Sequence, residues 1–335
     1  MHKNYRHDKM DIIFDKKCDF MAQLPNKEFH QLVPKLREKG FYPSQKPRDI
    51  KWPIYNQNEI DNIIEVLDFI RNSVDAIKLP SREGKTGRPL TNPHSLAKAI
   101  LLCEELHLDE RNAQGWLNIL GPRVGITEHL DDRVIGDAST KPEVIHILKK
   151  VFENTKDSNG TLAGDGTGLE STRKQNYENT KKKEGTYMTS IVDTREIVQA
   201  FDISGTQECR IMHDLITQVK GKILTLDAGF VDRKLVAKIA ELSMTPFVFP
   251  KKSVKLNGRP AWKLMYLTLF NNVLDWLITY HQRSHTESFH SSFKRTNGPV
   301  TKRRPTSLLS QITARIILHN RRKLSYFNKV ATQTT

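Results

Sequence analysis

The order of short apolar runs after Gly160 constrains the fold of this 335-residue chain more than any other feature. Turn residues separate these runs, as they separate short strands. The sequence predicts three strands, a helix, a strand, a helix and a strand, over residues 161–170, 186–194, 196–204, 208–219, 222–229, 231–242 and 245–250. Further helices are predicted from Trp262 onward. Helices that alternate with strands in this way indicate an α/β fold.

In the residues before this region, the apolar residues recur mainly at helical spacing. Asp109 is placed to cap the start of one of these helices. The predicted helices cover residues 58–73, 95–106, the segment after Asp109, and 142–152. A further helix is predicted near residues 27–39, where Pro34 would kink it. A smaller all-α region therefore precedes the α/β part of the chain.

The charge of the chain is strongly basic and unevenly distributed. The sequence holds 53 Lys and Arg against 38 Asp and Glu, which gives a net charge of +15. From Tyr280 to the end there are eleven basic residues and one acid, Glu287, so +10 of the +15 lies in the last sixth of the chain. Such a basic surface suits a polyphosphate partner such as nucleic acid. A basic tail that only aids solubility is the alternative.

Composition excludes several other classes of protein. Apolar residues make up 37% and charged residues 27%, which permits a sizeable core and argues against global disorder. No run of about 18 apolar residues occurs, so we expect no transmembrane helix and no membrane partner. The polar N-terminus lacks the apolar core of a secretory signal. The three cysteines are scattered, with no metal-spaced pair, which favours a reducing, cytoplasmic setting: Cys18, Cys103 and Cys209.

Two aspartates occupy positions where an α/β sheet binds ligands. Asp165 lies in or just past the first predicted strand, and Asp227 ends the apolar strand before a helix. An acid that ends an apolar strand is costly unless it is paired or bound to a metal. Small residues surround both acids and would let a large backbone such as DNA approach closely: Gly164, Gly166, Gly168, Ala228 and Gly229. Taken singly, each aspartate also fits a turn.

One predicted helix carries a group of polar side chains on a single face. On one continuous helix, Tyr280, Arg283, Glu287 and Lys294 fall within an arc of about 60°. Ile278, Phe289 and Phe293 then point the opposite way, toward a core. The cations and the phenol can hold phosphates, and the carboxylate can complete a metal site. Ion pairing between Arg283 and Glu287 at i,i+4 is the simpler alternative.

The spacing of these four residues resembles a known family. They match the YREK pattern of the DDE transposases of prokaryotic insertion sequences. In this pattern two residues separate Tyr from Arg, three separate Arg from Glu, and six separate Glu from Lys. The DGTG and LDAGF segments around Asp165 and Asp227 resemble the first two aspartate motifs of that family. The resemblance covers about Gly84–Leu324 and is weak over the first 60 residues. Asp227 and Glu287 are only 60 residues apart, so the large β-rich insertion of some relatives must be absent or minimal.

The resemblance implies a fold and a reaction. The fold would be a ribonuclease-H-like mixed sheet with flanking helices over residues 156–325, after a helical DNA-binding region over 1–155 and before a tail over 326–335. Asp165, Asp227 and Glu287 would be catalytic and would bind two Mg²⁺ or Mn²⁺ ions. The reaction would be metal-dependent cleavage at transposon ends, followed by 3′-hydroxyl strand transfer into target DNA.

The resemblance also implies partners. The partner would be double-stranded DNA, both the terminal inverted repeats of the element and the target DNA. A homodimer would act on paired ends. The protein would be associated with the prokaryotic nucleoid when bound to DNA. Tyr280, Arg283 and Lys294 would hold phosphates of the transposon end.

Further basic residues are candidates for DNA contacts. Arg295, Lys302, Arg303 and Arg304 follow the YREK helix and could contact phosphates, with a solvated basic loop as the alternative. The linker before the paired helices could enter a minor groove through Lys85 and Arg88, or serve only as a linker. The helix near residues 305–323 offers four more cations to the DNA backbone: Arg315, Arg321, Arg322 and Lys323.

Several weaker candidates have simple structural interpretations. Asp193, Asp202 and Asp232 fit turns or caps. His281 and His285 are four residues apart and could bind zinc, but no third ligand is visible, so we interpret them as surface or DNA-facing residues. The four tryptophans are interpreted as core residues: Trp52, Trp116, Trp262 and Trp276.

Two rival functions remain open at the level of the sequence. One is a transposase-derived DNA-binding protein that no longer cuts. The other is a ribonuclease-H-like nuclease that cuts without strand transfer. Joining of a supplied 3′-hydroxyl end to a plasmid would distinguish a transposase from the second rival.

Overall fold

The computed structural model describes residues 31, 33–36, 38, 50–80, 91–172, 186–204, 208–251 and 258–334. Contacts between residues divide this part of the chain into two compact units. The first unit includes Asn159–Asp165 and Thr206–Ser284. The second unit combines Arg48–Ser158, Gly166–Gly205 and His285–Thr335. The second unit therefore joins segments that are far apart in the sequence.

A five-stranded mixed sheet has the strand order β3-β2-β1-β4-β5. Its strands are β1 (Thr161–Leu169), β2 (Thr186–Asp193), β3 (Val198–Ser204), β4 (Ile223–Leu226) and β5 (Thr245–Val248). In the first unit β1 pairs parallel with β4, and β4 pairs parallel with β5. In the second unit β2 and β3 form an antiparallel pair. The mixed sheet and its helices confirm the predicted ribonuclease-H-like α/β class.

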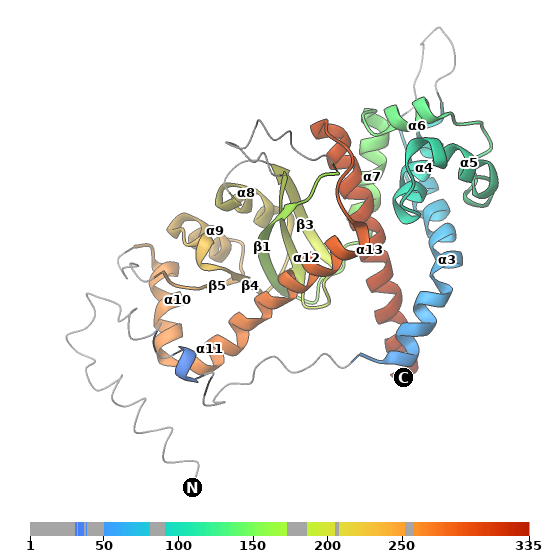
Figure 1. Ribbon diagram of the computed structural model, residues 1–335. Helices are drawn as coiled ribbons and strands as arrows, with labels where there is room; N and C mark the ends of the chain where they lie inside the picture. Colours follow the sequence, from blue (N-terminus) through green and yellow to red (C-terminus); the bar gives the residue numbers. More distant parts are fainter. Residues whose placement is uncertain are drawn as a thin grey trace. The chain divides into compact units, whose positions relative to one another are not determined.

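Helices of the first unit pack on the parallel strands. They are α8 (Glu208–Leu215), α9 (Arg233–Glu241), α10 (Pro260–Asn271) and α11 (Val273–Tyr280). The crossover from β4 through α9 to β5 buries Leu235, Val236 and Ile239, which recur on one face of α9. Both α9 and α11 contact β5, and Figure 1 shows α8 and α9 beside these strands. This packing holds the first half of β1 and the carboxyl end of β4 in place.

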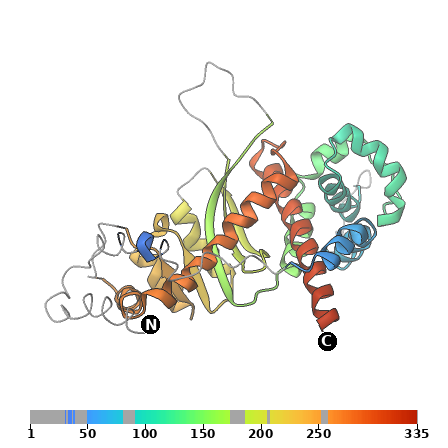
Figure 2. The same cartoon turned by 60° about the horizontal axis from the view of Figure 1, so that its bottom comes forward.

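The second unit contains a helical core around the longest helix. Its helices are α3 (Trp52–Asp75), α4 (Pro93–Glu105), α5 (Glu110–Leu120), α6 (Asp132–Ala138), α7 (Pro142–Asn154), α12 (Ser284–Asn297) and α13 (Pro305–Thr334). α13 packs against α3, α4, α7 and β3, and Figures 1 and 2 both show it, in red, alongside α3 in blue. Ile312, Ile316 and Ile317 are fully buried on its inner face. The residues predicted as a tail, 326–335, continue α13 as far as Thr334.

The predicted helices of the N-terminal region are confirmed with small changes at their ends. Asp109 caps α5 as expected, because its Oδ1 accepts a hydrogen bond from the Asn112 backbone N–H at 2.8 Å. Of the helix predicted near residues 27–39, the described residues are helical, and the rest lie outside the described part. Within the described residues, no helix has the length and apolar character needed to span a membrane.

Candidate active site

Asp165 and Asp227 lie side by side on two neighbouring parallel strands, Asp165 in the middle of β1 and Asp227 directly after the last residue of β4. The register pairs Gly164 with Leu226, the residues that come directly before the two aspartates. Because neighbouring strands run about 5 Å apart, the two backbones present their carboxylates to the same place. The carboxyl end of β4, where Asp227 lies, is where an open α/β sheet binds ligands. The first unit therefore positions two acids together through its strand register.

The local structure of Asp227 fixes its side chain. The strand ends at Leu226, and a 3₁₀ turn, Ala228–Phe230, begins directly after Asp227. Asp227 caps this turn, with Oδ1 accepting a hydrogen bond from the Ala228 N–H at 2.7 Å. A Cβ added at Gly229 would meet nothing within 4 Å, so the turn beside Asp227 faces open space.

The glycine before Asp165 has an internal role rather than the predicted one. A Cβ at Gly164 would lie 2.7 Å from Leu226 Cδ2 and 2.8 Å from Met212 Cε. A side chain at Gly164 would therefore displace Leu226 of β4 and Met212 of α8. Gly164 is buried, so the idea that it gives DNA close access is wrong. Gly229, in contrast, fits the predicted open approach.

Each of the two aspartates is contacted by a residue from the end of the α11 segment. Arg283 donates from Nη1 to Asp165 Oδ2 at 3.3 Å, and both side chains are 20% exposed. The Tyr280 hydroxyl donates to Asp227 Oδ1 at 3.5 Å, a long hydrogen bond. The guanidinium offsets part of the negative charge that two adjacent carboxylates bring together. Two of the four residues of the YREK pattern therefore contact the aspartates.

Tyr280 is mainly a buried aromatic residue. Only 7% of it is exposed, and its ring stacks on Trp276 with a centroid distance of 5.3 Å. Burial raises the pKa of the Tyr280 phenol well above its usual range, and the nearby Arg283 charge lowers it by less. The hydroxyl therefore stays protonated across the neutral range and can donate to an oxygen acceptor.

The predicted continuous helix from Tyr280 to Lys294 is wrong. α11 ends at Tyr280, a 3₁₀ turn covers His281–Arg283, and α12 begins at Ser284. The advance of 100° per residue does not hold through a 3₁₀ turn. The four residues of the YREK pattern therefore do not share one face of a single helix. Ile278, expected in the core, is 44% exposed, whereas Phe289 and Phe293 are buried as predicted.

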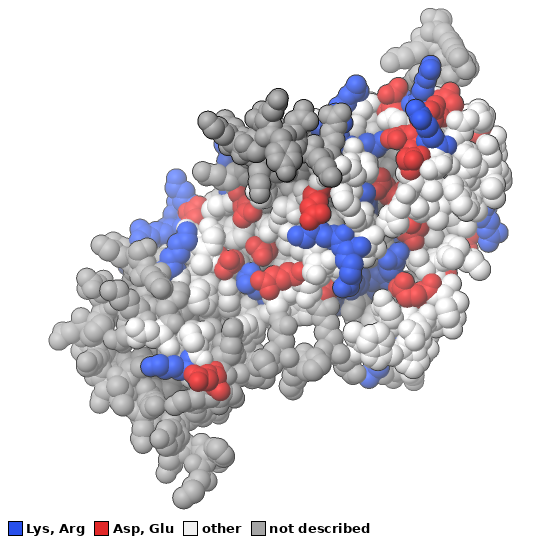
Figure 3. All heavy atoms as spheres, viewed as in Figure 1, with Lys and Arg blue, Asp and Glu red and all other residues white. Residues whose placement is uncertain are grey.

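The last two residues of the pattern lie on α12 in the second unit. Glu287 is exposed in the first turn of α12, and Lys294 lies seven residues further along the same helix. Lys294 donates from Nζ to Thr167 Oγ1 at 2.9 Å. Thr167 follows Asp165 by two residues on β1, and no pattern in the sequence singled it out. Figure 3 shows basic side chains gathered over the end of α12, whose last turn carries Lys294 and Arg295.

The other predicted DNA contacts differ in availability. Arg295, Arg303 and Arg304 are exposed. Lys302 is partly buried and forms an ion pair with Glu110 of α5, so part of its charge is already used within the second unit. Lys85 and Arg88 lie outside the described residues.

The basic residues of α13 are used within the second unit. Arg315 pairs with Glu104 at 2.6 Å, and Arg321 pairs with Glu65 at 2.9 Å. Arg322 and Lys323 pair with Glu105 and Glu196. These ion pairs join α13 to its neighbours, so the four cations that were predicted to face DNA each already have an acidic partner within the second unit.

The weaker acidic candidates have structural roles. Asp193 is fully buried and its Oδ1 accepts backbone N–H bonds from Arg195 and Ile197, which closes the turn between β2 and β3. Asp232 caps α9, as predicted. Asp202 lies within β3, not at an element end, and its Oδ1 accepts from the Ile203 N–H.

The pair of carboxylates formed by Asp165 and Asp227 fits a hard divalent cation. Asp165 and Asp227 both offer carboxylate oxygens and are partly exposed, so an ion and a phosphate could reach them. Carboxylates suit Mg²⁺ or Mn²⁺ better than softer metals. Between Asp227 and Glu287 the described residues include the short strand β5 and are otherwise helical or irregular, in keeping with the expected absence of a large β-rich insertion.

Comparison with known proteins agrees with this geometry. Residues 158–321 match the family model described as Transposase DDE domain. The match includes Asp165, Asp227 and all of the YREK pattern. No curated protein matches the chain.

Proposed function

This chain belongs to the DDE transposases of the insertion-sequence type, and we propose that it cuts DNA at the ends of its element and joins the freed 3′-hydroxyl ends to target DNA. The parallel register that places Asp165 and Asp227 side by side carries this proposal. The pair lies inside the matched transposase domain, beside the carboxyl end of β4, where such a fold binds its ligands.

We propose that Asp165, Asp227 and Glu287 bind two Mg²⁺ or Mn²⁺ ions. The family generally uses divalent metals, and the carboxylate donors fit them. Such ions would supply a polarised attacking oxygen and charge stabilisation for the leaving 3′ oxygen. Glu287 enters this set by its place in the YREK pattern, with its side chain exposed on the first turn of α12.

The cationic and phenolic residues would orient the acids and then hold DNA. Arg283 keeps Asp165 in one direction through a charge-assisted hydrogen bond. Tyr280 does the same for Asp227, and its buried ring gives the hydroxyl a fixed position. Lys294 lies beside Thr167 on β1. We propose that these three donors also contact phosphates of the element end.

The proposed partner is double-stranded DNA, both the terminal inverted repeats and the target. Two ends must be brought together before transfer, so we propose that a homodimer acts on paired ends. The exposed residues Arg295, Arg303 and Arg304 are the proposed backbone contacts outside the YREK pattern.

The test compares wild type with Asp227→Asn on DNA that bears the element's ends, in Mg²⁺ and in Mn²⁺. Asparagine keeps an oxygen that can cap the turn after β4, so folding should be preserved. We expect the variant to bind DNA like wild type and to lose cleavage and strand transfer. Asp214→Asn, at an exposed position of α8 in the same unit, is the matched control and should retain both reactions.

The outcomes separate the rivals. If wild type binds but never cuts, even with its own ends, the chain is a DNA-binding relic. If it cuts but cannot join a supplied 3′-hydroxyl end to a plasmid, it is a nuclease without strand transfer. Unchanged cleavage by Asp227→Asn would remove Asp227 from the active site.

A further inference from the structure

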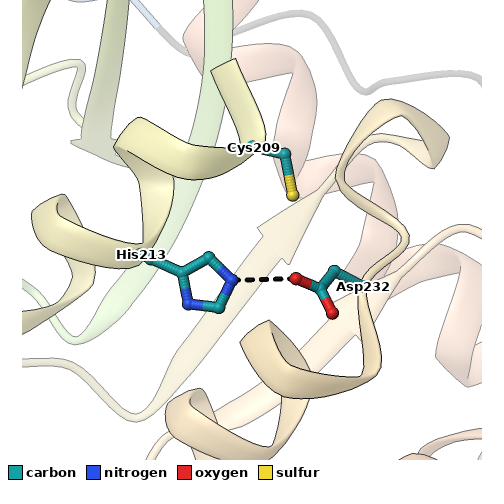
Figure 4. A group of neighbouring side chains, drawn as sticks. All are labelled: Cys209, His213 and Asp232. Carbon is teal, nitrogen blue, oxygen red and sulfur yellow. Dashed lines mark hydrogen bonds and ion pairs between the residues drawn. The ribbon is translucent and has the colours of Figure 1, made fainter. Parts of the chain in front are cut away.

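We propose that Cys209, His213 and Asp232 form a zinc-binding site in the first unit. Their ligand atoms, a thiol sulfur, an imidazole nitrogen and a carboxylate oxygen, all lie within 4.8 Å of one another. Figure 4 shows the three side chains directed toward a common space between α8 and the start of α9. This site uses none of the three acids of the proposed catalytic centre.

The local structure explains why these three side chains meet. Cys209 and His213 are four residues apart on α8, so they lie on the same face, one turn apart. Asp232 is the N-cap of α9, and its Oδ1 accepts a hydrogen bond from the Lys234 N–H at 2.8 Å. That bond turns its other oxygen, Oδ2, toward His213 Nε2, at 2.9 Å. The cap thus orients the third ligand.

The surrounding contacts hold the two elements in register. Lys238 of α9 donates from Nζ to the His213 backbone oxygen at 2.6 Å. α8 and α9 also pack directly against each other. The ligand atoms are therefore brought together by contacts other than the site itself, as metal affinity requires of a preorganised site.

The donor chemistry selects zinc over magnesium. Thiolate, imidazole and carboxylate are ligands of Zn²⁺, whereas Mg²⁺ prefers oxygen alone. A tetrahedral ion with ligand distances of about 2.0–2.3 Å would set its ligand atoms about 3–4 Å apart. The observed separations need only small side-chain movements to reach this. His213 and Asp232 are 25% and 32% exposed, so solvent can reach the group and supply a fourth ligand.

The simplest alternative is a His213–Asp232 ion pair that links α8 to α9. That alternative accounts for two of the three residues. It gives no role to Cys209, whose sulfur lies in the same small space. A bound zinc ion uses all three side chains.

The site would act on the turn that carries a catalytic aspartate. Asp232 follows Asp227 by five residues, across the 3₁₀ turn Ala228–Phe230. A zinc ion that ties Asp232 to α8 would restrict the movement of this turn. We therefore expect a structural role, in which zinc stabilises the first unit.

The experiment is a titration of the full-length, metal-free protein with Co²⁺ and then Zn²⁺. We expect one Co²⁺ per chain to give a thiolate-to-cobalt charge-transfer band, separate from any Co²⁺ at the carboxylates of the catalytic site, with loss of the band when Zn²⁺ displaces Co²⁺ and a higher thermal midpoint with Zn²⁺. Cys209→Ser, His213→Gln and Asp232→Asn should each weaken binding by at least about 10–100-fold, since even outer-shell partners contribute that much. Asp232→Asn retains an acceptor for the α9 cap.

Cys103→Ser is the matched control, because Cys103 lies on α4 in the second unit, and it should keep the full titration. Asp227→Asn should also bind zinc like wild type, which separates this site from the catalytic one. If the thiolate band does not form, or persists in Cys209→Ser, the proposal is overturned. Folding of each variant is checked by circular dichroism before titration.

Discussion

Tyr280 combines a core role and a polar role in one residue. Its ring lies between Phe249 and Trp276, while its hydroxyl reaches Asp227 at 3.5 Å. The ring determines where the hydroxyl is, because a buried aromatic side chain has few ways to move. A phenylalanine in this position would keep the first role and remove the second.

We predict that Tyr280→Phe leaves folding nearly intact and impairs the reaction. Loss of one long hydrogen bond should change the free energy of unfolding by less than about 1 kcal/mol. If the hydroxyl holds a phosphate, cleavage of end-bearing DNA should fall by about 10–100-fold, the equivalent of one hydrogen bond to a charged group. Thermal melting and cleavage kinetics measure the two effects. Tyr280→Ala is the contrast, since removal of the ring should cost about 3–5 kcal/mol of stability.

Two histidines of the second unit lie in its interior in their neutral form, His290 buried and His319 half-buried. His290 forms a hydrogen bond between Nε2 and Ser190 Oγ at 2.8 Å, and burial, with the Lys294 charge, lowers its pKa to about 3. His319 lies against the Glu196 backbone oxygen, and burial, with the charge of Lys323, lowers its pKa to about 4. Both residues are parts of the packing around α12 and α13.

We predict that these histidines make the protein less stable as the pH falls. Below the ordinary histidine pKa of 6.5, these histidines bind protons in the unfolded chain but stay neutral in the folded protein. The stability they contribute is complete above pH 6.5 and declines toward pH 4 and pH 3, by about 1.4 kcal/mol per histidine and pH unit. Denaturant unfolding at pH 7, 6 and 5 should show this slope, and His290→Gln should reduce it. A slope unchanged in His290→Gln but altered in the exposed control His107→Gln would contradict the assignment.

At the scale of the element, α13 is held by charge as well as by its apolar face. Arg315 is only 5% exposed, donates to Glu104 at 2.6 Å and also donates to the backbone oxygen of Gly298. Its guanidinium therefore joins α13 to α4 and to the segment after α12. If Arg315 is removed, the charge of Glu104 is left without its cationic partner in a largely buried place, which is unfavourable.

We predict that Arg315→Ala destabilises the protein by about 3–5 kcal/mol, the usual cost of breaking a buried ion pair. The measurement is chemical denaturation followed by circular dichroism. The exposed Arg304→Ala should change stability by less than about 0.5 kcal/mol. If Arg315→Ala instead changed stability little and weakened DNA binding strongly, Arg315 would be a DNA contact after all.

At the scale of the whole molecule, net charge overstates the positive surface that is available to DNA. The chain has a net charge of +15, but Arg315, Arg321, Arg322 and Lys323 are paired with acids from other elements. The exposed cations of the C-terminal region that remain outside α13 include Arg303 and Arg304. Phosphate contacts should therefore depend on these positions more than on α13.

We predict that Arg303→Ala/Arg304→Ala weakens binding to all DNA sequences alike and makes it less dependent on salt. Each phosphate contact adds about 0.9 to the slope of log affinity against log salt concentration, so the slope should fall by about 1–2. Fluorescence anisotropy over a series of salt concentrations measures this. The control Lys149→Ala/Lys150→Ala removes two exposed cations of α7 and should leave the slope unchanged.

Local patterns in the sequence were enough to predict the elements and the identity of the domain. The order of strands and helices, the Asp109 cap and the family resemblance all depend on residues within short windows, and all agree with the structure or the family match. The same is true of Asp165, which lies inside the first strand of the α/β region, and of Asp227, which directly follows a strand. Short-range backbone geometry and turn chemistry act locally, so a single sequence carries them.

Only the tertiary structure decided which residues meet. Trp262 and Trp276 are buried, but Trp52 and Trp116 are 60% and 46% exposed, and no local pattern separates the two pairs. The i,i+4 spacing of Cys209 and His213 was a visible signal, yet its third member, Asp232, comes from a different helix. The pairing of α13 cations with distant acids was equally hidden. Contacts across long separations depend on how elements pack, and this information is spread over the whole chain.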